Sequence, residues 1–116
     1  MLIEILKSKL QDGYITESRE DYEGSVRIDE EIMLEMGLVT NEVVEINSLE
    51  FNARHRTYVI PGPAGSKEIS VRGALAQYFK RGDRVHLNCF CYMTQEEACD
   101  HKPVVVKTNV WVSKQS

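Results

Sequence analysis

The chain has 116 residues and a formal net charge of -4, from 14 basic and 18 acidic side chains. This length predicts one domain that buries a real core and is too short for two domains. The basic residues are scattered rather than grouped in a stripe, so nucleic acid is not expected as a partner.

The N-terminus and the cysteines predict a cytoplasmic protein. Residues 1–7 have no basic n-region, and charges interrupt their apolar run, so no signal peptide is expected. No stretch approaches the length of a membrane span, so no membrane partner is expected. Three cysteines is an odd number, which favours reduced core thiols over disulfides.

Most of the chain predicts short strands. Residues 2–10 are ambiguous, because their apolar positions fit both a helix and an alternating strand, and the periodicity favours a helix. β-Branched and aromatic residues predict strands at residues 14–16, 25–28, 42–48, 56–60, 68–71, 84–93 and 104–106. A turn is expected at residues 61–66, and residues 111–116 are expected to form a tail that frays.

Three short helical segments interrupt the strands. Residues 29–37 predict a helix that Asp29 caps and Gly37 ends. Residues 73–79 begin with small residues and predict one or two helical turns. Thr94, with Glu97 three residues later, predicts a capping box. Many short strands with a few brief helices indicate a closed β-barrel.

The bond between Gly24 and Ser25 is a candidate for self-cleavage. A serine hydroxyl can attack the preceding carbonyl carbon where the backbone is bent, and glycine tolerates such a bend because it has no Cβ. The resulting ester can eliminate to a dehydroalanine, which hydrolyses to a pyruvoyl group. Such a ketone is an electron sink. A Gly-Ser pair alone is almost no evidence for cleavage, because it occurs in most proteins and is typical of an ordinary turn.

Further motifs occur in order along the chain. They are Lys9, Tyr22-Glu23-Gly24-Ser25, Ile28-Asp29, Asn52-Ala53-Arg54, Thr57-Tyr58-Val59-Ile60, Gly73-Ala74-Leu75-Ala76, Gly82-Asp83, Met93-Thr94, Glu96-Glu97-Ala98 and Lys102-Pro103. In this order and spacing, the chain resembles the pyruvoyl-dependent aspartate 1-decarboxylase family. The resemblance covers nearly the whole sequence and weakens after about Val106.

The resemblance implies a mainly β fold, a six-stranded double-psi β-barrel with a few short helices in one domain, residues 1–116. It implies self-cleavage into a short chain, residues 1–24, and a longer chain, residues 25–116. It also implies a homotetramer with active sites between neighbouring subunits, and it leaves open whether a maturation protein takes part. The implied reaction converts L-aspartate to β-alanine and CO2 for pantothenate biosynthesis.

The resemblance also implies roles for individual residues. Ser25 becomes the pyruvoyl group, which forms a Schiff base with the substrate, and Tyr58 supplies a proton after CO2 leaves. Lys9 and Arg54 bind the substrate carboxylates. Thr57 assists cleavage. The further substrate-binding candidates are Thr57, Arg72, Gly73, Ala74 and Leu75.

The chemistry of these side chains agrees with the implied roles. Aspartate has two carboxylates, and the planar fork of Arg54 binds a carboxylate in bidentate fashion. A tyrosine within hydrogen-bond reach can donate a proton. Taken singly, Lys9 and Arg54 also fit solvated surface charges, and Tyr58 fits a core aromatic. The histidines have no metal-site spacing, so no metal is expected.

Several positions depart from the family pattern. Arg72 stands where the family usually has Asn, and Leu75 stands where a small Ala is usual. Further from Ser25, Gln11-Asp12 replaces His-Arg and Phe51-Asn52 replaces Asn-Gly. An Arg72 that points to solvent would be harmless, because the guanidinium would then lie outside the site.

An inward Arg72 leads to two hypotheses. Its guanidinium has donors only, so the acceptor needed for cleavage would be missing and maturation would be slow or absent. Alternatively, its charge and the bulk of Leu75 reshape the pocket for another acidic amino acid, for example a sulfonate or phosphonate. A third alternative is an uncleaved, non-catalytic barrel that acts as a regulatory or assembly partner.

Overall fold

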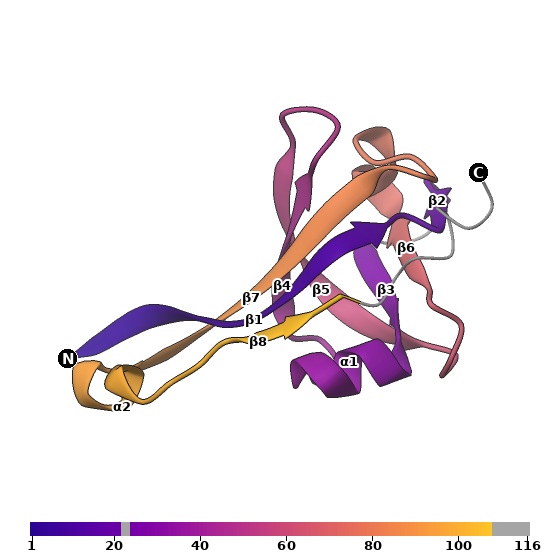
Figure 1. Cartoon of the computed structure of the whole chain (residues 1–116). Helices are drawn as coiled ribbons and strands as arrows, with labels where there is room; N and C mark the ends of the chain where they lie inside the picture. The colour runs from indigo at the N-terminus through magenta and orange to yellow at the C-terminus, as the bar shows by residue number, and fades with distance from the viewer. Residues whose placement is uncertain (22–23, 108–116) are drawn as a thin grey trace.

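The computed structural model describes residues 1–21 and 24–107, and Figure 1 shows their arrangement. Eight strands form one mixed sheet in the order β2-β6-β3-β5-β4-β7-β1-β8. The strands are β1 (Leu2–Tyr14), β2 (Glu17–Arg19), β3 (Ser25–Asp29), β4 (Val43–Ser48), β5 (Arg54–Gly62), β6 (Ile69–Arg72), β7 (Arg84–Thr94) and β8 (Val104–Val106). The helices are α1 (Glu30–Met36), α2 (Gln95–Cys99) and the 3-10 helix η1 (Gly73–Gln77).

The expected fold class, mainly β with short helices, is confirmed. The described residues form eight strands rather than the expected six, and the strands at the two ends of the sheet, β2 and β8, have only three residues each. The expected strands in the second half of the chain are all present, with ends that differ by a few residues. The expected tail at residues 111–116 lies outside the described residues.

The helix expected at residues 2–10 is wrong, because this segment belongs to β1. β1 pairs antiparallel with β7 from Leu2 opposite Thr94 to Tyr14 opposite Arg84. The register shifts between Leu6 and Ser8, and such a bulge interrupts the two-residue alternation of a strand. The apolar spacing therefore imitates a helix, while long pairing with β7 decides the structure.

The paired strands β1 and β7 form a long ribbon that extends from the body of the molecule (Figure 1). α2 lies at the far end of this ribbon, beside the N-terminus. The capping box expected there is confirmed: the Glu97 N–H donates to Thr94 Oγ1 at 3.1 Å, and the Thr94 N–H donates to Glu97 Oε1 at 2.9 Å.

β3 lies inside the sheet and is paired along both edges. It runs antiparallel to β6 and parallel to β5. Val26 and Ile28 are fully buried in the hydrophobic core, to which Phe79 also belongs. Ser25 is the first residue of β3, which confirms that the Gly24–Ser25 bond lies at the start of a strand.

Asp29 fixes the other end of β3. Its Oδ1 accepts the Glu31 N–H at 2.8 Å, which confirms it as the N-cap of α1, and also accepts the Gly65 N–H at 3.0 Å. Its Oδ2 accepts the Lys67 N–H at 2.8 Å. Burial alone would raise the pKa of Asp29, but these three donors outweigh burial and hold the pKa below its ordinary value of 3.8.

Removing this carboxylate should destabilise the fold. We expect Asp29→Ala to lower the free energy of unfolding by about 1–3 kcal/mol, because a cap and buried hydrogen bonds are lost. Since the folded-state pKa is depressed, the contribution of Asp29 is present above the unfolded-state pKa and disappears as the pH falls through the folded-state pKa.

Urea titrations at pH 7 and at pH values below 4 test this expectation. The stability difference between wild type and Asp29→Ala should shrink on acidification. Glu35→Gln, on the exposed face of α1, is the control and should change stability by less than about 0.5 kcal/mol. Equal stability of Asp29→Ala and wild type at pH 7 would contradict the assignment.

Candidate active site

The strand register places Ser25 between two expected site residues. Ser25 is 3% exposed and lies directly opposite Arg72 on β6. On its other edge, β3 pairs with β5 from Val26 opposite Val59. Because these strands are parallel, Ser25 and Tyr58 each precede that pair by one residue. Ser25, Arg72 and Tyr58 therefore start from three adjacent strands at one level of the sheet.

Gly24 immediately precedes β3, and Gly73, the first residue of η1, immediately follows β6. A Cβ added to Gly24 would meet the Arg72 carbonyl oxygen at 4.0 Å, an ordinary contact, so space around the described atoms does not itself require glycine there. Gly73 has φ +69°, in the left-handed region, which does favour glycine. This conformation turns the chain from β6 into η1.

The side chains of η1 point in different directions. Ala74 is exposed, whereas Leu75 is 8% exposed and belongs to the hydrophobic core. The bulk of Leu75 therefore occupies core volume. This placement gives no support to the hypothesis that Leu75 fills a substrate pocket.

β5 provides three of the expected residues on alternating faces. Thr57 is half-buried, whereas Tyr58 and Arg54 are exposed, with the Arg54 side chain 73% exposed. Arg54 Nε donates a hydrogen bond of 3.0 Å to Asn47 Oδ1. Arg54 and Tyr58 share one face of β5 but are four residues, or roughly 13 Å, apart along the strand.

Lys9 lies in a different part of the sheet. It is half-buried on β1, opposite Asn88 of β7 on one side and Val105 of β8 on the other. Three strands, β5, β4 and β7, separate β1 from β3. Four strand spacings amount to roughly 19 Å along the sheet. Within one chain, Ser25, Tyr58 and Arg72 are thus neighbours in the strand register, whereas Lys9 lies four strands from Ser25 in the order of the sheet.

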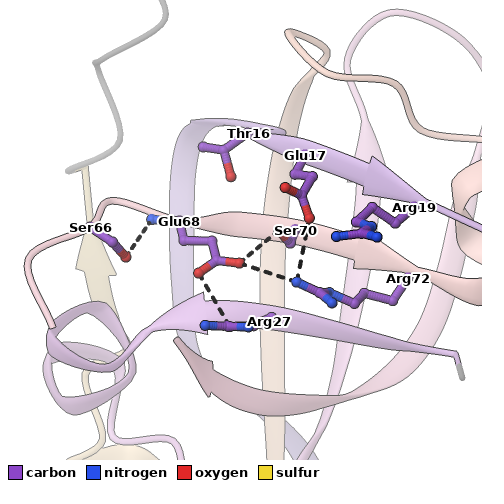
Figure 2. A pocket seen from close by; sticks show the side chains of 8 residues that line it. All are labelled: Thr16, Glu17, Arg19, Arg27, Ser66, Glu68, Ser70 and Arg72. Atoms are coloured by element: carbon purple, nitrogen blue, oxygen red, sulfur yellow. Dashed lines mark hydrogen bonds and ion pairs between the residues drawn. The ribbon is translucent and has the colours of Figure 1, made fainter. Parts of the chain in front are cut away.

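A polar pocket of about 500 Å³ opens beside β3 and β6 (Figure 2). In it, Arg72 Nη2 lies 3.4 Å from Glu17 Oε1 and 3.7 Å from Glu68 Oε2. Arg27 Nε lies 3.3 Å from the other oxygen of Glu68. The pocket is lined by Thr16, Glu17, Arg19, Arg27, Ser66, Glu68, Ser70 and Arg72.

Arg72 therefore does not point to open solvent, because its side chain is only 9% exposed and pairs with carboxylates. Our sequence reasoning missed this pocket. A signal was available, because polar residues two apart, such as Glu17 with Arg19 and Ser70 with Arg72, share one face of a strand. The pairing of the two strands with each other, which brings them into one pocket, came only from the structure.

His86 is a second residue that the sequence reasoning left without a role. It lies opposite Asn47, the partner of Arg54, and its Nδ1 accepts the Asp12 N–H at 3.2 Å. Burial, and then the positive charge of Lys9, lower the pKa of His86, while Asp12 acts in the opposite direction. The register agrees with this effect, because Lys9 pairs with Asn88, which shares one face of β7 with His86 two residues earlier.

Removing the charge of Lys9 should raise the pKa of His86. We expect the imidazole resonances of His86 in Lys9→Met to titrate at higher pH than in wild type, because the ammonium no longer opposes protonation. Lys102→Met removes an exposed charge elsewhere and serves as the control. An NMR titration in which Lys9→Met leaves the pKa of His86 unchanged, or lowers it, would show that Lys9 does not face His86.

The three cysteines are free thiols, but the expectation of core thiols is correct only for Cys89, because Cys91 is half-buried and Cys99 is exposed. Cys89 is buried, and its Sγ donates to Glu42 Oε2 at 2.8 Å. The same oxygen accepts from Lys7 Nζ at 2.8 Å. Burial, and then Glu42, raise the pKa of Cys89 to about 12. Cys89 therefore stays protonated near neutral pH and is a poor nucleophile.

Residues 1–21 and 24–107 contain neither a metal-binding cluster nor a membrane-spanning helix. No three His, Cys, Asp or Glu side chains in these ranges cluster as they would around a metal ion. No helix in the same ranges is long and apolar enough to cross a membrane.

Comparison with known proteins gives consistent matches. A family model described as aspartate decarboxylase matches residues 1–112. Aspartate 1-decarboxylase of Caldicellulosiruptor bescii is 41% identical over 106 residues, covering 91% of this chain and 83% of that protein. Aspartate 1-decarboxylase of Caulobacter vibrioides is 40% identical and covers 91% and 90%. Among solved structures, the computationally designed msDPBB_sym2 protein aligns with a TM-score of 0.45 and 18% identity, over 75% of this chain and 96% of that one.

Proposed function

The chain belongs to the aspartate decarboxylase family, and from this premise we propose that it is a self-processing lyase whose pyruvoyl group forms from Ser25. The family converts L-aspartate to β-alanine and CO2, a step of pantothenate biosynthesis. The observation that best supports the proposal is the position of the Gly24–Ser25 bond. It opens an internal strand beside Tyr58 and the backbone of Arg72.

In the proposed maturation, Ser25 Oγ attacks the carbonyl carbon of Gly24. A C–O bond forms, the amide C–N bond breaks, and the nitrogen of Ser25 takes the hydroxyl proton. Loss of the Cα proton then breaks the bond between Cβ and the ester oxygen, which leaves Gly24 as a carboxylate. Water converts the remaining dehydroalanine to the ketone and releases ammonia. Thr57, next to Tyr58 on β5, would assist the first step.

The proposed cleavage would divide the chain in two but would leave the strands of the two parts paired with each other. The short chain, residues 1–24, would contain β1 and β2, and the long chain, residues 25–116, would contain the other strands. β1 stays paired with β7, and β2 stays paired with β6. The described hydrogen-bond pattern therefore accommodates a cut at this position.

The proposed turnover uses residues from two parts of the sheet. When formed, the ketone at residue 25 supplies an electron sink for the bond to the departing carboxylate. Tyr58 would give a proton to the carbon that lost this carboxylate. Arg54 and Lys9 would bind and orient the dicarboxylate. The turn from Arg72 through Gly73 and Ala74 to Leu75 would border the substrate mainly through its backbone.

We further propose that the active site is shared between subunits of a homotetramer. Lys9 and Ser25 are several strands apart within one chain, and the face that contains Arg54 and Tyr58 is exposed. A neighbouring subunit could bring its Lys9 to Ser25. A cytoplasmic location, where the free thiols persist, and the involvement of a maturation protein stay predictions.

A shared site predicts complementation between two inactive variants. Ser25→Ala cannot form the pyruvoyl group, and Lys9→Ala lacks a substrate cation. We expect co-expression of the two to restore part of the activity, because a mixed oligomer can combine Ser25 of one subunit with Lys9 of another. The measurement is β-alanine formation by the co-purified oligomer. No activity in mixed oligomers, despite activity in wild type, would place both residues within one subunit.

The proposed function is tested by incubating the protein with L-aspartate and measuring β-alanine and CO2. Ser25→Ala should remain uncut and form no product. Tyr58→Phe should still mature but lose about 10²–10⁴-fold in kcat, because the proton donor is absent. Tyr92→Phe, which removes an exposed hydroxyl that donates to Glu4 at 3.3 Å, is the matched control. Product formation by Ser25→Ala would refute the role of Ser25.

The position of Arg72 weakens the hypothesis of an altered substrate preference but leaves the hypothesis of slow maturation unchanged. The guanidinium offers no acceptor in any orientation, so slow maturation stays a prediction. The idea that extra positive charge selects another acidic amino acid is weakened, because Glu17 and Glu68 compensate the charge of Arg72.

A further inference from the structure

Two carboxylates contact the guanidinium of Arg72. We call Glu17 and Glu68 the carboxylate clamp. Arg72 lies opposite Ser25 through its backbone, but its side chain turns back along β6 towards Glu68, four residues earlier (Figure 2). There Nη2 meets Glu68 at 3.7 Å and donates to Glu17 at 3.4 Å.

Glu68 is the better fixed member of the clamp. Its side chain is 17% exposed, compared with 48% for Glu17. Ser70 Oγ donates to Glu68 Oε2 at 2.7 Å, and Arg27 Nε lies 3.3 Å from Oε1. The guanidinium groups of Arg72 and Arg27 therefore lie against these two carboxylates, and Arg19 adds a third guanidinium to the pocket lining. An ion pair this poorly exposed to solvent is screened less than a surface pair.

Without the clamp, Arg72 would have Ser25 within reach. Residues directly opposite in an antiparallel pair have Cα atoms about 4.5–5.5 Å apart, which is shorter than an extended arginine side chain. Loss of a carboxylate partner would leave a poorly solvated positive charge, and such a charge seeks another anion. A substrate carboxylate at residue 25 would be that anion.

A cation at the departing carboxylate opposes decarboxylation. The bond between Cα and the carboxylate breaks, its electron pair moves towards the ketone-derived electron sink, and the carboxylate leaves as neutral CO2. Its negative charge therefore decreases towards the transition state. A guanidinium paired with it stabilises the bound substrate more than the transition state, which tightens binding and slows the chemical step. The other carboxylate of the substrate keeps its negative charge throughout the reaction, so a cation bound to it does not slow this step.

We propose that Glu68, assisted by Glu17, is a positioning residue that withholds Arg72 from the departing carboxylate. This inference rests on the proposed function, because it needs a pyruvoyl group at residue 25. Glu68 does not touch the substrate and acts only through Arg72. Its role is therefore distinguished from a structural one by whether replacing Arg72 removes the effect of losing Glu68.

The test measures kcat and KM for L-aspartate in oligomers of wild type, Glu68→Gln and the double variant Glu68→Gln/Arg72→Asn. Rates are expressed per ketone, titrated with a hydrazine reagent, so that uncut chains do not count. We expect Glu68→Gln to lower both kcat and KM about tenfold, the size of one charge-assisted contact. The double variant should return kcat to the wild-type range.

Two further variants complete the design. Glu50→Gln breaks a 2.7 Å ion pair with Arg84, outside the polar pocket, and should change neither constant. If Glu68→Gln stays uncut, Glu17→Gln provides the same comparison, with a smaller decrease in both constants because Glu17 is more exposed.

The outcomes separate the inference from the proposed function. A lower kcat without a lower KM, or a loss that Arg72→Asn does not restore, would show a structural role for Glu68 and overturn the inference. Unchanged constants in both Glu68→Gln and Glu17→Gln would do the same. A wild-type protein with no titratable ketone and no β-alanine would instead overturn the proposed function, and the inference with it.

Discussion

The arrangement around Ser25 depends on the pairing of β3 along both of its edges. β6 on one side and β5 on the other hold five residues in an extended conformation, and Asp29 fixes the end of this strand through three backbone donors. The Gly24–Ser25 bond lies at the other end of this strand, at its start. In the proposed maturation, a cut at the start of this fixed strand would break the backbone while the strands stay paired.

The order of the strands also decides which groups can meet. Tyr58 lies on β5 and Arg72 on β6, and these two strands are the immediate neighbours of β3. The strand order therefore determines that both residues lie near Ser25 in the sheet. Lys9 belongs to β1, whose long pairing with β7 holds it in another part of the sheet. The chemistry needs cations for two carboxylates, and the sheet separates one of them from Ser25. The proposed oligomer would resolve this conflict, because a neighbouring subunit would supply the missing cation.

The sequence predicted those features that local chemistry determines. Asp29 and Gly37 at the ends of α1, and Thr94 at the start of α2, were correct because caps depend on residues a few positions apart. β1 was mistaken for a helix because a bulge disturbs its alternation, and its true partner is about eighty residues away in sequence. The Arg72 contact with Glu17 was missed for the same reason, because it requires the register of β2 and β6, which no local pattern specifies. The contact with Glu68 was missed although Glu68 is only four residues before Arg72.

The intact mass of the protein under denaturing conditions, before and after prolonged warm incubation, tests the central claim most directly. Our account predicts two chains that separate between Gly24 and Ser25, with a ketone on the longer chain that borohydride reduces. A single chain of 13.3 kDa that stays uncut would contradict it.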